Sequence, residues 1–338
     1  MNRKSFLSTL LPAGISLPFF ANAFPYQSLA PRIPPSLKSG DAIGITAPAG
    51  HITAEELKPA IQQMESWGLR IKLGNTIGKR DFGFGGTDAE RAADFQQMLD
   101  DPSIKAIMCA RGGYGSIRIV DQLNFSKFLN KPKWIIGFSD ITVLHCHIAS
   151  NFQIATIHSK MCNSFPTDWN AAEPGQRETI LSIRDALTGI IMKYKTPPHE
   201  KNRTGIAEGQ LTGGNLKTIE TIAGSKSEIK TAGKILFVED TGEYLYSIDR
   251  MFWNLQRSGK LSQLKGLVIG GFRIKPDDPG EEFGRTLYDI VWEKVKRYNY
   301  PVCFEFPVGH QMNNYALKCG ALHRLSVTAN GVELQEIR

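Results

Sequence analysis

The chain has 338 residues, of which 41% are hydrophobic and 22% charged, and its formal net charge is +7. This composition is typical of a globular protein long enough for two domains, and it excludes a disordered or fibrous chain. Lys and Arg form no stripe interleaved with aromatic residues, so a nucleic-acid partner is not indicated, whereas an anionic substrate or surface suits the charge.

The first 23 residues differ from the rest of the chain. Arg3 and Lys4 precede a mostly apolar stretch over 6–20, and Ala21-Asn22-Ala23 has the small-x-small form of a signal-peptidase site. The pattern predicts an exported, periplasmic protein with a signal peptide over 1–23, of the Sec or relaxed twin-arginine kind. An extended leader over 24–35 would follow.

A membrane anchor or a first helix of the fold is the alternative interpretation of this segment. The apolar stretch is short for a span, which needs about 20 residues, and Pro12 and Pro18 interrupt it. We therefore expect no stable membrane span after processing.

Strand-like and helix-like segments then alternate. The long helix has Thr87 as its N-cap and Glu90 three residues later, the pattern of a capping box. Such alternation predicts an α/β domain over 36–164 whose parallel, doubly wound sheet is covered on both faces, with its site at the carboxyl ends of the strands. The predicted strands are 42–47, 69–73, 104–110 and 134–138, and the predicted helices are 54–67, 88–99, 117–123 and 141–150.

The pattern changes after residue 164. Four prolines and mixed polarity over 165–204 indicate a helical linker with loops, and a second, β-rich α/β domain is expected over 205–338. Its C-terminus reads as a hairpin around Asn330-Gly331, a good two-residue turn. The other predicted strands are 234–238, 266–269 and 302–306, and the predicted helices are 247–255 and 286–296.

The cysteines and the pair His145 and His147 indicate neither a disulfide framework nor a metal site. Five scattered cysteines fit neither a disulfide framework nor metal-ligand spacing. His145 and His147 are two residues apart in a predicted helix, so their side chains leave on different faces and cannot close on one ion.

Ser116 is the candidate nucleophile. A predicted strand runs into Arg111-Gly112-Gly113-Tyr114-Gly115-Ser116, and a helix is expected directly afterwards. A nucleophile elbow needs small residues at such a turn, and the N–H of Ile117 would then face a developing oxyanion at the helix N-terminus. A serine N-cap and a phosphate-binding loop are the alternatives.

A serine nucleophile needs a base and an acid that orients it. His310 follows a predicted strand in Pro307-Val308-Gly309-His310, a turn at a strand's carboxyl end, although a surface loop histidine is the alternative. For the acid, spacing leaves Glu239, Asp240 and Glu243 open, because all three follow the strand 234–238.

Seven ordered motifs resemble those of the LD-carboxypeptidase family of serine peptidases, which includes muramoyl-tetrapeptide carboxypeptidases and microcin C immunity proteins. The resemblance covers roughly residues 36–326. The motifs are 40–50 (GDAIGITAPAG), 85–88 (GGTD) with Arg91, 110–116 (ARGGYGS), 137–142 (GFSDIT), 211–216 (LTGGNL), 237–240 (FVED), and 307–310 (PVGH) with Asn314.

The resemblance implies a Ser-Glu-His triad, which we place at Ser116, Glu239 and His310, in a two-domain protein that forms a homodimer. It implies that the serine attacks the carbonyl of diaminopimelate or lysine joined to a terminal D-Ala in a murein peptide, through an acyl-enzyme and with no metal or cofactor. Gly86 is taken as the second oxyanion donor after Ile117.

Two further residues carry predictions. Arg111 is expected to bind the substrate's free carboxylate, with a structural pairing to Asp140 or to an acid of the other domain as the alternative. Ser139 is a rival nucleophile, but Ser139-Asp140-Ile141-Thr142 reads better as a helix N-cap.

Two other functions remain open at this point. One is a microcin-immunity-like hydrolase of peptidyl or aminoacyl-nucleotide analogues, which shares the expected fold. The other is a non-catalytic periplasmic peptide-binding protein with two α/β domains around a cleft.

Overall fold

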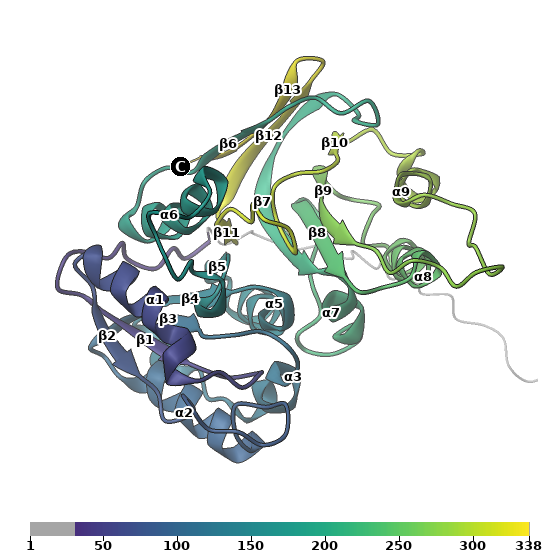
Figure 1. Cartoon of the computed structure of the whole chain (residues 1–338). Coiled ribbons are helices and arrows are strands. Elements are labelled where there is room, and N and C mark those ends of the chain that lie inside the picture. Colours follow the sequence, from purple (N-terminus) through teal and green to yellow (C-terminus); the bar gives the residue numbers. More distant parts are fainter. Residues whose placement is uncertain (1–30, 338) are drawn as a thin grey trace, which may run out of the picture. The chain divides into compact units, whose positions relative to one another are not determined.

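The computed structural model describes residues 31–337, whose strands form two β-sheets (Figure 1). The predicted signal peptide lies outside the described residues, as does the leader up to residue 30. The described end of the leader lies against the first sheet, because Arg32 N donates to Gln153 O, Ala155 N donates to Arg32 O, and the Trp134 indole donates to Pro35 O at 3.0 Å.

The first sheet has six strands in the order β11-β5-β4-β3-β1-β2. The first five strands along the chain are parallel, and the chain order reverses between β1 and β3, so the predicted doubly wound parallel sheet is confirmed. β11 pairs antiparallel with β5. The strands are β1 (Ala42–Thr46), β2 (Arg70–Leu73), β3 (Ile104–Cys109), β4 (Trp134–Gly137), β5 (Thr156–His158) and β11 (Leu317–Cys319).

Helices cover both faces of this sheet because alternate residues of its strands point to opposite sides. Met108 of β3 shares one core with Leu57, and Ile107 shares the other with Phe95. Thr87 and Glu90 form the predicted capping box. The helices are α1 (Ala54–Ser66), α2 (Asp88–Asp100), α3 (Ser116–Ile119), α4 (Ser126–Asn130) and α5 (Thr142–Phe152).

The second sheet has seven strands in the order β10-β9-β8-β7-β12-β13-β6. β10, β9, β8 and β7 are parallel to one another. From β7 onward, through β12 and β13 to β6, each strand is antiparallel to the next. The predicted C-terminal hairpin is β12 and β13. The strands are β6 (Lys193–Thr196), β7 (Gly205–Asn215), β8 (Ile235–Thr241), β9 (Gly266–Arg273), β10 (Val302–Cys303), β12 (Leu322–Thr328) and β13 (Gly331–Glu336).

The helices of this half are α6 (Pro174–Thr188), α7 (Leu216–Thr221), α8 (Leu245–Arg257) and α9 (Leu287–Val295). Apolar side chains of α8 and α9, among them Phe252 and Val291, share a core with Leu236 of β8. α8 and α9 therefore pack against β8.

The segment over 165–204, predicted as a linker, contains a helix and a strand. Besides the expected helix, which is α6, it contains β6, the outer strand of the second sheet. In the opposite direction, β11 comes from the C-terminal half but completes the first sheet. The sequence did not show either exchange, because strand pairing over such distances leaves no local pattern.

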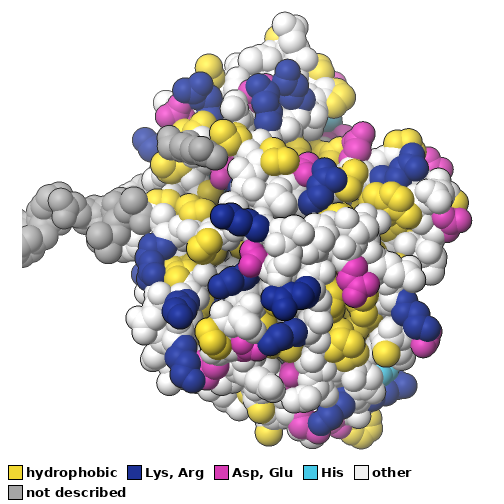
Figure 2. Space-filling view, turned by 90° about the vertical axis from the view of Figure 1, so that its left-hand side faces the viewer, with side chains coloured by type: hydrophobic (Ala, Val, Ile, Leu, Met, Phe, Trp, Pro, Cys, Tyr) yellow, Lys and Arg dark blue, Asp and Glu magenta, His cyan; other side chains and the backbone are white. Residues whose placement is uncertain are grey.

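The charged side chains are spread over the surface, in line with the mixed composition of the chain. Figure 2 shows Lys and Arg side chains dispersed among acidic and uncharged ones over the face that it presents. Within residues 31–337, no helix combines the length and the apolar character needed to cross a membrane.

Candidate active site

His310 and Glu239 form a direct contact. The His310 Nδ1 and Glu239 Oε2 atoms lie 2.6 Å apart, and Nδ1 donates because a carboxylate only accepts. The Glu239 side chain is fully buried and that of His310 is 18% exposed. The carboxylate thus fixes the ring so that Nε2 is the nitrogen left for proton transfer.

Glycines make this contact fit. Glu239 lies near the end of β8, opposite the irregularity where β9 gains an extra residue around Gly270 and Gly271. Gly309 has a φ of +102°, and a Cβ on it would lie 2.4 Å from the Glu239 Cβ. Only a glycine therefore lets the chain pass close enough to Glu239 to present His310 to it.

The other two candidate acids have different partners. Asp240 accepts hydrogen bonds from the Asn215 side-chain amide at 2.9 Å and from Lys217 N, and burial raises the pKa of Asp240 to about 6. Glu243 lies in the loop after β8 and lines a cavity that His310 does not line. The structure brings only Glu239 of these three acids against His310.

Ser116 lies where the sequence placed it, at the first residue of α3 after β3, but it is fully buried. Its backbone is helical, and its N–H donates to Asp140 Oδ2 at 2.8 Å. The strain of this turn falls on Gly113 and Gly115, with φ of +106° and +145°. The Ser116 hydroxyl has no hydrogen-bond partner in the part of the chain that the structure describes, at the N-terminus of the helix that follows the Gly-rich turn.

Ser139, the rival nucleophile, takes a strained position in the next turn. It follows β4 directly after Phe138, its φ is +61°, and it is partly exposed. A non-glycine residue in this region is strained by about 1–2 kcal/mol, as in nucleophile elbows. The predicted N-cap role is wrong, since Ser139 begins a short 3-10 helix and its side chain makes no capping hydrogen bond.

The turn at Ser139 also lies beside the base. The Phe138 ring centroid is 4.9 Å from that of His310. No hydrogen bond joins either serine to His310 among the described residues. Such contacts are often long before substrate binds and tighten in the complex.

The Gly-rich loop after β3 packs against Ser139. A Cβ on Gly112 would lie 3.3 Å from the Ser139 Cβ, and Gly50 N donates to Gly112 O at 2.9 Å. Since that carbonyl is held by Gly50, the N–H of the same peptide group, on Gly113, points the opposite way. Gly113 and Ser139 both line one cavity of about 240 Å³.

The predicted oxyanion donors lie in two places. Ile117 lines the same cavity as Ser139. Gly86 lies at the start of α2, where its carbonyl accepts from Arg91 Nε at 3.2 Å and a Cβ on it would meet Glu90. The roles of both donors stay predictions, and the contacts of Gly86 are those of a structural turn.

Arg111 points toward α1 rather than toward His310. Its Nη1 lies 3.8 Å from Glu56 Oε1 and 3.4 Å from His51 O, and the side chain is 45% exposed. Neither the expected role in carboxylate binding nor the alternative pairing with Asp140 has support in these contacts.

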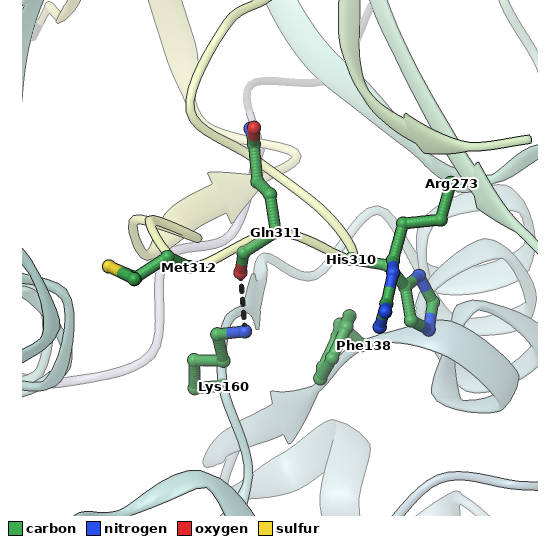
Figure 3. A pocket seen from close by; sticks show the side chains of 6 residues that line it. All are labelled: Phe138, Lys160, Arg273, His310, Gln311 and Met312. Carbon is green, nitrogen blue, oxygen red and sulfur yellow. Dashed lines mark hydrogen bonds between the residues drawn. The ribbon is translucent and has the colours of Figure 1, made fainter.

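The sequence did not indicate which cationic residues lie beside His310. A cavity of about 400 Å³ beside the imidazole contains Lys160 and Arg273 (Figure 3). Neither residue stands in a recognisable motif, and the fold brings them together from different sheets.

The histidine pair in α5 has separate partners. His145 Nε2 lies 2.9 Å from Gly137 O, and His147 Nδ1 lies 2.9 Å from Ser227 Oγ. Burial lowers the pKa of His145 to about 4, so its ring is neutral near pH 7. These contacts are those of structural histidines.

A buried carboxylate that orients an imidazole, together with a serine after a tight turn, is the arrangement of a serine hydrolase. Models of the LD-carboxypeptidase N-terminal and C-terminal domains match residues 43–159 and 208–325. The chain belongs to the LD-carboxypeptidase family, and it is a serine-type peptidase.

Curated relatives agree with this assignment. The chain is 32% identical to the "Probable murein peptide carboxypeptidase" of Bacillus subtilis over 85% of this chain and 89% of that protein. It is 30% identical to the murein tetrapeptide carboxypeptidase of Pseudomonas aeruginosa over 82% and 91%.

Solved structures show the same fold. The muramoyltetrapeptide carboxypeptidase from Oxalobacter formigenes is 28% identical, with a TM-score of 0.78 over 88% of this chain and 99% of that one. A microcin C7 self-immunity protein in complex with glutamyl sulfamoyl guanosine is 24% identical, with a TM-score of 0.78 over 89% and 98%, and it shares the fold.

Proposed function

We propose that this enzyme removes the terminal D-Ala from murein tetrapeptides by cleaving the L,D bond between diaminopimelate or lysine and D-Ala. The observation that carries the proposal is the Glu239–His310 hydrogen bond. The names of the relatives supply the substrate class.

We propose Ser116 as the nucleophile, as the family motif over 110–116 implies. Its hydroxyl lies at the start of α3 and has no hydrogen-bond partner among the described residues. His310 takes the Ser116 proton as the hydroxyl oxygen attacks the carbonyl carbon, and Glu239 stabilises the imidazolium that forms.

The tetrahedral intermediate needs hydrogen-bond donors at its oxyanion. In an elbow one donor is the N–H of the residue after the nucleophile, here Ile117. The Gly113 N–H is the second that we propose, because Gly113 lines the same cavity as Ile117 and its peptide group is fixed by Gly50. His310 then protonates the leaving amine, and water hydrolyses the acyl-enzyme through the same base.

The test is incubation of the protein with L-Ala-γ-D-Glu-meso-diaminopimelate-D-Ala, followed by mass spectrometry. We expect loss of one D-Ala from the tetrapeptide, and no loss with His310→Ala. A lysine-containing tetrapeptide run in parallel measures the side-chain preference. Absence of D-Ala release by the wild-type protein on both peptides contradicts the proposal.

The two alternative functions give different results in the same assay. A microcin-immunity-like hydrolase would cleave aminoacyl-sulfamoyl nucleosides and leave the tetrapeptide intact. A peptide-binding protein would show tetrapeptide affinity by calorimetry and no turnover before any substitution.

Export and dimerisation also belong to the proposal. We propose that residues 1–23 direct the protein to the periplasm and are removed there, on the sequence pattern, and that it forms a homodimer, on the family resemblance. The N-terminal residue of the protein recovered from a periplasmic fraction, and its mass by light scattering, test these two points.

A further inference from the structure

The cavity beside His310 contains two positive charges and no carboxylate. It holds about 400 Å³ and shares its wall with the imidazole, so any group in it lies next to the base (Figure 3). Its lining residues are Phe138, Lys160, Arg273, His310, Gln311 and Met312.

The two cations come from different sheets. Lys160 stands two residues after β5 of the first sheet, and Arg273 ends β9 of the second. Lys160 Nζ donates to Gln311 O at 2.7 Å, as the dashed line in Figure 3 marks, which leaves two of its three hydrogens for another acceptor. Within residues 31–337, neither cation forms an ion pair with an acid.

This arrangement is electrostatically uncompensated. Burial lowers the pKa of Lys160, and the neighbouring Arg273 lowers it further, whereas the Glu239 carboxylate raises it. Two like charges that face one partly buried cavity become favourable when an anion binds between them.

The chemistry of the proposed reaction decides which anion this is. His310 gives its proton to the leaving amine, so the leaving amino acid lies on the His310 side of the nucleophile. The leaving residue of a carboxypeptidase carries a free α-carboxylate. The cavity lined by Ile117 and Ser139 contains three carboxyl groups, of Asp140, Asp240 and Glu243, against one cation, Lys217, and is therefore less suited to such a group.

We propose that Lys160 and Arg273 bind the α-carboxylate of the leaving D-amino acid, and that they restrict the enzyme to the free end of a peptide. This inference rests on the proposed function. Arg273 can bind one carboxylate oxygen or both through its planar fork, while Lys160 supplies a point charge from the opposite sheet. Phe138 and Met312 border the same cavity and face the short side chain of D-Ala.

A pair of substrates tests this directly. The tetrapeptide and its C-terminal amide contain the same scissile bond, but the amide lacks the carboxylate. Arg273→Gln and Lys160→Gln should each lower kcat/KM for the free acid by about 10- to 100-fold, mainly through KM, as expected for loss of a charged hydrogen bond. The rate with the amide should change less than about threefold.

Two controls separate binding from structure. Lys160→Arg keeps the charge and should recover most of the activity on the free acid. Lys226→Gln removes a charge in a different cavity and should leave the preference for the acid intact.

The outcomes are distinct. If both variants keep the wild-type ratio of acid to amide rates, or if both rates fall equally, the inference is wrong while the proposed function stands. If the wild-type protein releases no D-Ala from the tetrapeptide, the proposed function fails and this inference fails with it.

Discussion

The turns after β3 and β4 differ in how they hold a serine. In the turn after β3, glycines take the strained positions, and Ser116 enters α3 buried and hydrogen-bonded through its N–H. In the turn after β4, the serine itself takes the strained position. The turn after β3 therefore relieves its strain at glycines and leaves its serine in a helix, whereas the turn after β4 places the strain on the serine itself.

Removing each hydroxyl is the largest expected effect and breaks the comparison most directly. Ser116→Ala should lower kcat for D-Ala release by about a thousandfold or more, since the residues of a triad act as a unit. Ser139→Ala should retain activity within about threefold, because its hydroxyl takes no part in the proposed reaction. Steady-state kinetics with the tetrapeptide measure both.

A covalent probe gives an independent readout of the same difference. A fluorophosphonate should modify Ser116 and leave Ser139 unmodified, as peptide mass spectrometry would show, and His310→Ala should slow the labelling. Labelling at Ser139 would move the nucleophile to the turn after β4.

Asp140 connects the two turns, and its titration sharpens the comparison. Burial raises the pKa of Asp140 above its ordinary value of 3.8, against the hydrogen bond from Ser116 N, so the folded protein binds this proton more tightly than the unfolded chain. The stabilisation that this proton provides is complete below 3.8 and is lost as the pH rises through the raised value.

In Asp140→Asn, the free energy of unfolding should therefore fall less as the pH rises from 3.8 through the raised pKa of Asp140. The reason is that an amide does not titrate, while its oxygen still accepts from Ser116 N. Asp140→Ala should lower stability at every pH by about 1–3 kcal/mol, since the buried N–H of Ser116 loses its acceptor. Thermal unfolding across the pH range compares the variants. An unchanged pH profile in Asp140→Asn would contradict the expectation.

Glycine substitution gives the smallest effect, but one of opposite sign in the two turns. Ser139→Gly should raise the free energy of unfolding by about 0.5–1 kcal/mol, because glycine adopts a positive φ without strain. Ser116→Gly should lower it by about 1 kcal/mol, because glycine is unfavourable in a helix. Equal signs in denaturant unfolding would show that the strain at Ser139 does not differ from that at Ser116.

The strand–helix alternation of the first domain was predictable because each element carries its own pattern. The capping residues Thr87 and Glu90 and the turn Asn330-Gly331 are local signals, and the structure confirms them. β7 was missed, since Gly205–Asn215 contains several glycines and a mixed pattern that does not read as a strand. β6 and β11 were missed because their pairing partners are far away in the sequence.

The site was predictable to the same extent. Glu239 and His310 were found from their places after a predicted strand, but the choice among Glu239, Asp240 and Glu243 needed the contact itself. Ser116 was singled out as the last residue of a Gly-rich turn between a strand and a helix, and the structure contains both elements. The positive φ of Ser139 was not predicted, because backbone strain on a serine leaves no local sequence pattern.

The pairing of β11 with β5 affects how the protein is made. The edge of the first sheet at β5 stays open until residues 317–319 have been synthesised, and an open strand edge is a template for pairing with other chains. A chain that stops before Leu317 would contain both serines, Glu239 and His310, yet would leave this edge exposed. Prematurely terminated chains should therefore aggregate rather than act as uncontrolled hydrolases, and the last strands to be synthesised complete the first sheet.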